Sequence, residues 1–385
     1  MKNRLASIDI LRGIAVLMVL CVHSPIPTVW NLSETFFVKH VLALGSFGVD
    51  LFFVLSGFLI SGLIFHEQNK TGEFGFARFW LRRAFKILPG YFVAYTVAFT
   101  LRQLGKTNIT IPERLAVEYP NFIFLQNYIY PEHRWMASWS LAVEEHFYLI
   151  LPALLVLLFR FKNKRIVPIT VASIAVVVAV NRFFAVAGGT PLELIYIQTH
   201  FRVDALCFGV ILGWFSIYRR EWFSSFGAYA RFAPLFVVCA LLIPLVSPLG
   251  GNGTAEQFGI PVMVICFGFL VSIAANLPSA GNDSGVKFIK NTSRILTEVG
   301  FYSYGIYLAQ AVMTYLPLNF LDAYFAGRFY FTGLSIPFFW IGSIFGGVVI
   351  SRLIEQPFLR LRERVVPKKK QISSAQTASS RTAAA

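Results

Sequence analysis

Charged residues are scarce in this sequence. Only 14% of its 385 residues are Asp, Glu, Lys or Arg, and 56% are hydrophobic, whereas soluble domains carry about 25% charged residues. The mean hydropathy is accordingly high, at +0.64. So few charges cannot cover a water-exposed globular surface. The composition therefore excludes an ordinary soluble protein and predicts that lipid surrounds much of the chain.

Cysteine is scarce as well, and no signal-peptide cleavage site is recognisable. The four cysteines are Cys21, Cys207, Cys239 and Cys266. All lie in apolar stretches without paired spacing, which predicts neither a disulfide framework nor a metal site. No small-x-small cleavage pattern follows the first apolar run, and Asp9 and Arg12 interrupt its start. We therefore expect an uncleaved first helix.

Apolar runs of membrane-spanning length, about 20 residues, recur along the whole chain. They predict an all-α fold, a polytopic membrane helix bundle of about ten transmembrane helices. The expected spans are 8–24, 43–65, 84–103, 139–159, 166–187, 199–218, 232–248, 258–277, 299–317 and 330–354. Within 104–138, whose role stays open, the apolar stretch Phe122–Tyr130 is too short to span and is expected to lie along the interface.

The positive charges predict how these helices are oriented. Loops on the N-terminal side hold 24 of the 34 lysines and arginines, and the opposite side holds 7, Arg182 among them. This alternation follows the positive-inside rule for an even number of spans and predicts that both termini lie in the cytoplasm. The net charge of +15 is thus explained by a membrane surface and not by nucleic acid.

The chain divides into a membrane domain, 1–366, and a tail, 367–385. The tail is basic and then rich in Ser, Thr, Ala and Gln, a composition typical of disorder. Its run Lys368–Lys370 either touches anionic lipid headgroups or is a solvated segment without a role.

Two ionisable residues fall inside the first span, where such residues are functional candidates. Arg12 and His23 are eleven residues apart, which places them on one helix face and roughly 16 Å apart along the axis. Arg12 is then close to the cytoplasm and His23 close to the outer end. The alternatives are an Arg12 that snorkels to the headgroups and a His23 that makes an interfacial hydrogen bond.

Further charges lie in the outer halves of other spans. Asp50 either caps its helix or orients a catalytic group. Glu144 and Glu145 are candidates for acid–base chemistry or for a hydrogen-bond network between helices, and their side chains point about 100° apart. Arg202 and Asp204 are expected to pair with each other or with Glu144.

A basic segment, Arg78–Lys86, lies at the cytoplasmic end of the third expected helix. It contains Arg82, Arg83 and Lys86. Positive-inside anchoring explains these charges, and the alternative is an anion site for phosphates.

Together, the motifs resemble a known family. They are Arg12-x10-His23, GVDLFFVLSGFLI, RRAFKILPGY, SWSLAVEEHFYL, YSYGIYL and LIEQPF, in this order along the chain. This set resembles the bacterial membrane acyltransferase-3 family. The resemblance implies a ten-helix enzyme of a bacterial cytoplasmic (inner) membrane that transfers an acyl group, usually acetyl, from coenzyme A to a carbohydrate hydroxyl. Typical acceptors would be the O-antigen of lipopolysaccharide, exopolysaccharide, peptidoglycan or lipo-oligosaccharide, and in some members a macrolide sugar.

The resemblance also implies roles for individual residues. His23 would be the catalytic histidine, and Glu144 would support the site. Asp50 is a further catalytic candidate from its place in the second span and not from the resemblance. Acetyl-CoA, a donor substrate and not a resident cofactor, would be held by basic residues, and the carbohydrate or glycolipid acceptor by a second set. The donor set is Arg12, Arg82, Arg83 and Lys86, and the acceptor set is Trp139, Glu145, Arg202 and Asp204.

The sequence departs from the family in four places. Lys86 stands where a second arginine is usual, Gln310 where a histidine is common, and Gln356 where a basic residue is frequent. Many relatives also carry an extracytoplasmic hydrolase-like domain, and the short tail predicts that none is present here.

The expected mechanism runs across the membrane. Acyl-CoA would enter from the cytoplasm, its pantetheine arm would lie along the Arg12–His23 face, and an outer hydroxyl would attack the thioester. His23 would act either as general base or as an acylated nucleophile. A sugar transporter or flippase and a non-catalytic acyl-CoA sensor are the alternative functions, and the oligomeric state stays open.

Overall fold

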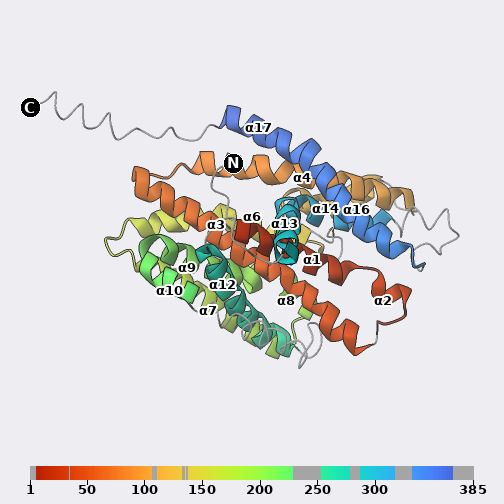
Figure 1. Cartoon of the computed structure of the whole chain (residues 1–385), viewed down its shortest axis with the longest axis horizontal. Coiled ribbons are helices and arrows are strands. Elements are labelled where there is room, and N and C mark those ends of the chain that lie inside the picture. Colours follow the sequence, from red (N-terminus) through yellow and green to blue (C-terminus); the bar gives the residue numbers. More distant parts are fainter. Residues whose placement is uncertain are drawn as a thin grey trace, which may run out of the picture.

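The computed structural model confirms an all-α membrane bundle. It describes residues 6–33, 35–105, 111–131, 135, 138–228, 253–277, 287–316 and 332–366, and these parts contain helices and turns but no β-strand. Eight helices in the described residues are long and apolar enough to cross a membrane. Figure 1 shows most of the long helices running roughly alongside one another, with α17 (Gln356–Val365) beside α4 (Phe76–Gly105).

Eight of the ten expected spans correspond to these eight candidates. They contain α1 (Ala6–His23), α3 (Gly48–Thr71), α4, α6 (Ser138–Phe159), α7 (Ile166–Ala187), α9 (Thr199–Tyr218), α12 (Ile260–Asn276) and α16 (Ser335–Ile350). Short elements join them: α2 (Ile26–Val29), η1 (Phe37–Val41), η2 (Leu42–Phe47), α8 (Leu192–Ile197), α10 (Arg220–Ala228), η6 (Ala255–Gly259) and η9 (Ser351–Glu355). The expected span 232–248 lies outside the described residues.

The expected span 299–317 differs from the structure. The chain forms two helices here, α13 (Lys287–Phe301) and α14 (Ser303–Leu316), which are interrupted at Tyr302. Among the residues that the structure describes, which here end at Leu316, α14 has 14 residues, fewer than the roughly 20 that cross a bilayer. Hydropathy did not predict this break. α13 is a basic amphipathic helix whose last residues belong to the same apolar run as α14, so the run was read as one span.

The described residues of 104–138 pack in part against the bundle, while Phe122, Ile123, Tyr128 and Tyr130 are exposed. It contains α5 (Ile111–Glu118) and the 3₁₀ turn η3 (Tyr119–Phe122). Asn127 is fully buried, and its amide donates to the carbonyl oxygens of Trp139 and Ile197, both at 2.8 Å. Tyr91 of α4 donates to the carbonyl oxygen of Asn121 at 2.8 Å. Buried amides thus hold the start of α6 against α4 and α8.

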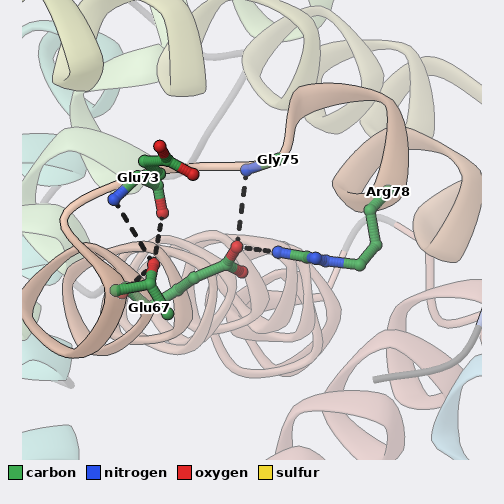
Figure 2. A network of polar contacts seen from close by, with 5 residues as sticks. Glu67, Glu73, Gly75 and Arg78 are labelled. Atoms are coloured by element: carbon green, nitrogen blue, oxygen red, sulfur yellow. Dashed lines mark hydrogen bonds and ion pairs between the residues drawn. The ribbon is translucent and has the colours of Figure 1, made fainter. Parts of the chain in front are cut away.

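A compact turn sets the register between α3 and α4. Gly72 ends α3 with a left-handed φ of 70°, a conformation that glycine adopts without strain. Figure 2 shows the Glu67 carboxylate accepting a hydrogen bond from the Gly75 backbone N–H and pairing with Arg78 on the first turns of α4. This contact fixes the part of α4 that precedes Arg82 and Arg83.

Helices α3 and α9 pack closely because both present glycine at the crossing. An added methyl group at Gly57 would overlap the carbonyl oxygen of Leu206, and one at Gly209 would overlap that of Val54. Small residues at such crossings let two backbones approach in a membrane.

We expect Gly57→Ala to destabilise the protein by about 1–3 kcal/mol, because overpacking forces the helices apart. Thermal unfolding of the detergent-solubilised protein measures the effect. Gly62→Ala on the same helix is the matched control, since no atom lies within 4 Å of its added methyl group. Equal stability of the two variants would contradict this account of the α3–α9 crossing.

Candidate functional site

A cavity of about 460 Å³ runs between the central helices. One face of α3 lines its length, through Val49, Phe52, Phe53, Leu55, Ser56, Leu59, Ile60 and Leu63. These positions follow helical spacing, and the fourteen residue-to-residue steps from Val49 to Leu63 rise roughly 21 Å. The cavity therefore extends along much of the thickness of a bilayer core, about 30 Å.

The two ends of the cavity differ in chemistry. At the aromatic end, Phe52 and Tyr307 meet edge to face with ring centroids 6.3 Å apart. Toward the other end, the basic end, the lining side chains include Arg83 and Lys86 of α4 and Arg362 of α17. The cavity thus combines an apolar, aromatic compartment with a cationic one.

Three of the four predicted donor-binding residues line this cavity, together with Glu144. Arg12, Lys86 and Arg83 come from different parts of α1 and α4, and all three lie within electrostatic reach of the Glu144 carboxylate. Arg12 also donates from Nε to the hydroxyl of Ser303 at 3.2 Å. The structure therefore brings together residues that the sequence singled out separately.

Glu144 is the acceptor at the end of a short hydrogen-bond chain. The Tyr148 hydroxyl donates to its Oε2 at 2.6 Å. Because that bond uses the only hydroxyl hydrogen of Tyr148, the neighbouring Ser56 hydroxyl donates to Tyr148 in turn. Arg83 lies over the Tyr148 ring, 5.8 Å from its centroid. Glu144 is thereby fixed in one orientation on the cavity wall.

We expect Tyr148→Phe to lower kcat/KM about ten-fold or more for a reaction that depends on Glu144, because a hydrogen bond to a charged group contributes roughly 1.5–3 kcal/mol. Kinetics of the purified protein measure the loss. Tyr218→Phe is the control, since its hydroxyl also donates to an acceptor, Asn69 Oδ1 at 2.7 Å, at an exposed position. Unchanged kinetics in Tyr148→Phe would show that Glu144 needs no such orientation.

His23 lies at the end of α1, outside the set of residues that line the cavity. Its Nδ1 is 2.9 Å from the carbonyl oxygen of Val19. A carbonyl only accepts, so Nδ1 carries the hydrogen and the neutral ring keeps its lone pair on Nε2. Gly48, which precedes Val49 of the cavity wall, packs against Ala15 and Val19 of α1. His23 is one helical turn beyond that contact.

Arg82 does not line the cavity. It forms an ion pair with Glu363 of α17 at 2.6 Å and donates to the carbonyl oxygen of Val366 at 2.6 Å. Adjacent arginines on a helix point about 100° apart, so Arg83 faces the cavity while Arg82 faces α17.

Asp50 and Arg202 form a fully buried ion pair, 2.8 Å apart, which joins α3 to α9. The Arg202 guanidinium also stacks over the Tyr196 and Trp139 rings, at 4.6 Å and 5.7 Å from their centroids. Neither charged residue lines the cavity. The expectation that Arg202 pairs with Asp204 or Glu144 is wrong, since Asp50 is its partner.

Asp204 pairs instead with Arg182 of α7, at 2.7 Å, where the Arg182 side chain is fully buried. The count of positive charges on the two sides of the membrane assigned Arg182 to the outer side, although this residue falls inside the expected span 166–187. Two ion pairs thus connect α3, α9 and α7. Glu145 points away from the cavity lining, and its buried Oε1 has no hydrogen-bond partner among the described residues.

Sequence reasoning missed several residues of the cavity wall. Ser140 and Tyr307 share a hydrogen bond of 2.5 Å, and Tyr304 donates to the carbonyl oxygen of Ile87 at 2.6 Å. These residues belong to the motifs SWSLAVEEHFYL and YSYGIYL, so the motifs could have identified them as candidates for the site. Glu355, which accepts from Ser351 at 2.8 Å, belongs to LIEQPF in the same way.

A polytopic all-α membrane protein with a long cavity, cationic at one end, is the class that this fold and site define. The sequence model of the acyltransferase-3 family, described as an acyltransferase domain, matches residues 5–355. The chain belongs to this family, which confirms the resemblance of its motifs.

Curated relatives carry O-acetyltransferase names. A Staphylococcus aureus protein with a provisional name of this kind is 30% identical over 217 residues, 53% of this chain and 34% of the relative. The peptidoglycan O-acetyltransferase OatA of Listeria monocytogenes is 28% identical over 233 residues, 57% of this chain and 35% of the relative. The matched part spans about a third of these relatives' length. No solved structure matches the chain at a significant level.

Proposed function

We propose that this protein is a membrane O-acetyltransferase that moves an acetyl group from acetyl-CoA to a hydroxyl of a cell-surface glycan or glycolipid. The observation that carries the proposal is the cavity, which is cationic at one end and leads along α3 toward the end of α1 that bears His23. Family membership and the names of the relatives support the acyl chemistry.

The donor fits the cavity by charge and by length. Its phosphates would bind Arg12, Arg83 and Lys86, as anions bind guanidinium and ammonium groups. Its uncharged pantetheine arm would lie along the α3 face, whose rise of roughly 21 Å matches an extended chain. Arg82 would act indirectly by fixing α17. With the orientation given by the positive charges, the donor enters from the cytoplasm of a bacterium.

His23 would then work on the acceptor. Its Nε2 lone pair removes the proton of the attacking hydroxyl while the hydroxyl oxygen bonds to the thioester carbonyl carbon. The carbon–sulfur bond breaks, and the proton passes from Nε2 to the departing thiolate, so that the products are the O-acetyl ester and free coenzyme A. The alternative route, acetylation of Nε2 before transfer to the hydroxyl, uses the same lone pair.

Proteoliposomes that contain the purified protein test the proposal. Labelled acetyl-CoA is supplied on one side and a glycan acceptor on the other, and covalently acetylated glycan is expected only with intact protein and with the donor on the side of the basic end. Mass spectrometry of surface glycans from cells with and without the protein identifies the acceptor. If glycan crossed the membrane without becoming acetylated, the result would contradict this proposal and indicate a transporter instead.

A further inference from the structure

The amphipathic helix α17 contributes one face to the cavity. Gln356, Leu359 and Arg362, spaced at every third residue, line the cavity. On the other side of the helix, Phe358, Leu361 and Val365 are exposed at 40%, 44% and 59%. A helix that follows the membrane-spanning α16 thus closes the basic end of the cavity, and Arg362 is the charged group that it presents there.

A network of two ion pairs, in which Glu363 binds both Arg82 and Arg362, holds the Arg362 side chain in place. Glu363 accepts from Arg362 Nη2 at 2.7 Å and, with the same Oε1, from Arg82 Nη2 at 2.6 Å. Arg82 is itself tied to the carbonyl oxygen of Val366 at 2.6 Å. The end of α4 and the end of α17 are thereby locked together, and the direction of the Arg362 guanidinium is set before any ligand binds.

Arg362 has a donor that no described residue uses. Its Nε is buried and has no hydrogen-bond partner among the described residues. A buried N–H without an acceptor costs roughly 1–3 kcal/mol, so an acceptor supplied by a ligand stabilises the site. An anionic oxygen meets this requirement best.

The electrostatics also favour an anion at this place. Arg362 and Arg83 are close enough to repel each other. The carboxylates on the cavity wall, Glu144 and Glu355, already accept hydrogen bonds from Tyr148 and Ser351. Converging guanidinium groups in a partly enclosed space are stabilised by a bound anion of more than one charge.

We propose that Arg362 binds a phosphate at the nucleotide end of the donor, so that α17 selects coenzyme A thioesters over thioesters that lack the nucleotide. This inference rests on the proposed function. A donor whose thioester points toward His23 has its opposite, charged end beside Arg83 and Arg362. The recognition residue would come from α17, at the end of the candidate span Ser335–Val365, and from no motif used to recognise the family.

Steady-state kinetics with two donors test the inference. Wild type and Arg362→Ala are compared with acetyl-CoA and with S-acetylpantetheine, which has the same thioester arm but no phosphate. We expect Arg362→Ala to raise the KM for acetyl-CoA about ten-fold or more, with kcat within two-fold and with the kinetics of S-acetylpantetheine unchanged. Arg362→Lys should recover part of the affinity, since it restores the charge without the guanidinium fork.

Arg360→Ala is the matched control, because Arg360 is an exposed arginine on the same helix and does not line the cavity. Equal KM values for acetyl-CoA in Arg362→Ala and wild type would overturn the inference. An equal loss with both donors would overturn it too, since this result indicates damage to the fold of the site. A wild-type protein that transfers no acetyl group from either donor refutes the proposed function itself.

Discussion

His23→Ala is expected to lower kcat for acetyl transfer by a factor on the order of 10²–10⁴, the contribution typical of a positioned general base, while the affinity for coenzyme A stays unchanged. The reason is geometric: the bond from Nδ1 to the Val19 carbonyl leaves Nε2 as the basic nitrogen, and His23 is one turn beyond the wall of the cavity. Turnover assays and direct coenzyme A binding measure the two quantities separately.

His40→Ala is the control for this variant. Its Nδ1 makes the same kind of bond, to the Phe36 carbonyl oxygen at 3.2 Å, but at an exposed position. Normal turnover in His23→Ala would refute the role of this histidine. Labelled acetyl-CoA without acceptor separates the two routes, because label retained by wild type and lost in His23→Ala indicates an acetylated histidine.

Asp50→Ala is expected to lower the free energy of unfolding by about 3–5 kcal/mol, because it leaves Arg202 as an unpaired charge between α3 and α9. The double variant Asp50→Leu/Arg202→Met should regain most of that stability, since no buried charge is left without a partner. Thermal or denaturant unfolding in detergent gives both values.

The control for this pair is Glu67→Gln at the α3–α4 turn. Its ion pair with Arg78 is partly exposed, with side-chain exposures of 27% and 25%, so a loss of at most about 1 kcal/mol is expected. The same variants decide between two roles for Asp50. A double variant that is stable but inactive would support the orienting role in catalysis, whereas a stable and active one shows that the ion pair is structural.

The spans were predictable because bilayer thickness fixes the length of each apolar run. The same count of residues per span placed Arg12 and Lys86 near the cytoplasm and Glu144 in the outer half of its helix, yet all three side chains line one cavity. Hydropathy carries no information on which helices are neighbours. The partners of Asp50, 152 residues away, and of Arg82, 281 residues away, therefore required the tertiary structure.

Helix direction within a motif was predictable only in part. The 100° separation of Glu144 and Glu145 places one of them on the cavity wall, as helical geometry requires. The same geometry separates Arg82 from Arg83, but the prediction from the sequence placed both arginines in one donor-binding set. A run of basic residues at a helix end satisfies the positive-inside rule in any rotation, so composition does not show which arginine faces inward.

The π-helical turn η9 determines the rotational phase of the helix that follows it. A π turn holds one residue more than an α turn, so Ser351–Glu355 offsets α17 by about 100° from the face that α16 alone would continue. Deletion of one residue here would preserve every side chain of α17 and its amphipathic pattern, yet carry Arg362 off the cavity. At this position a change in chain length would alter the site although the side chains of α17 stay the same.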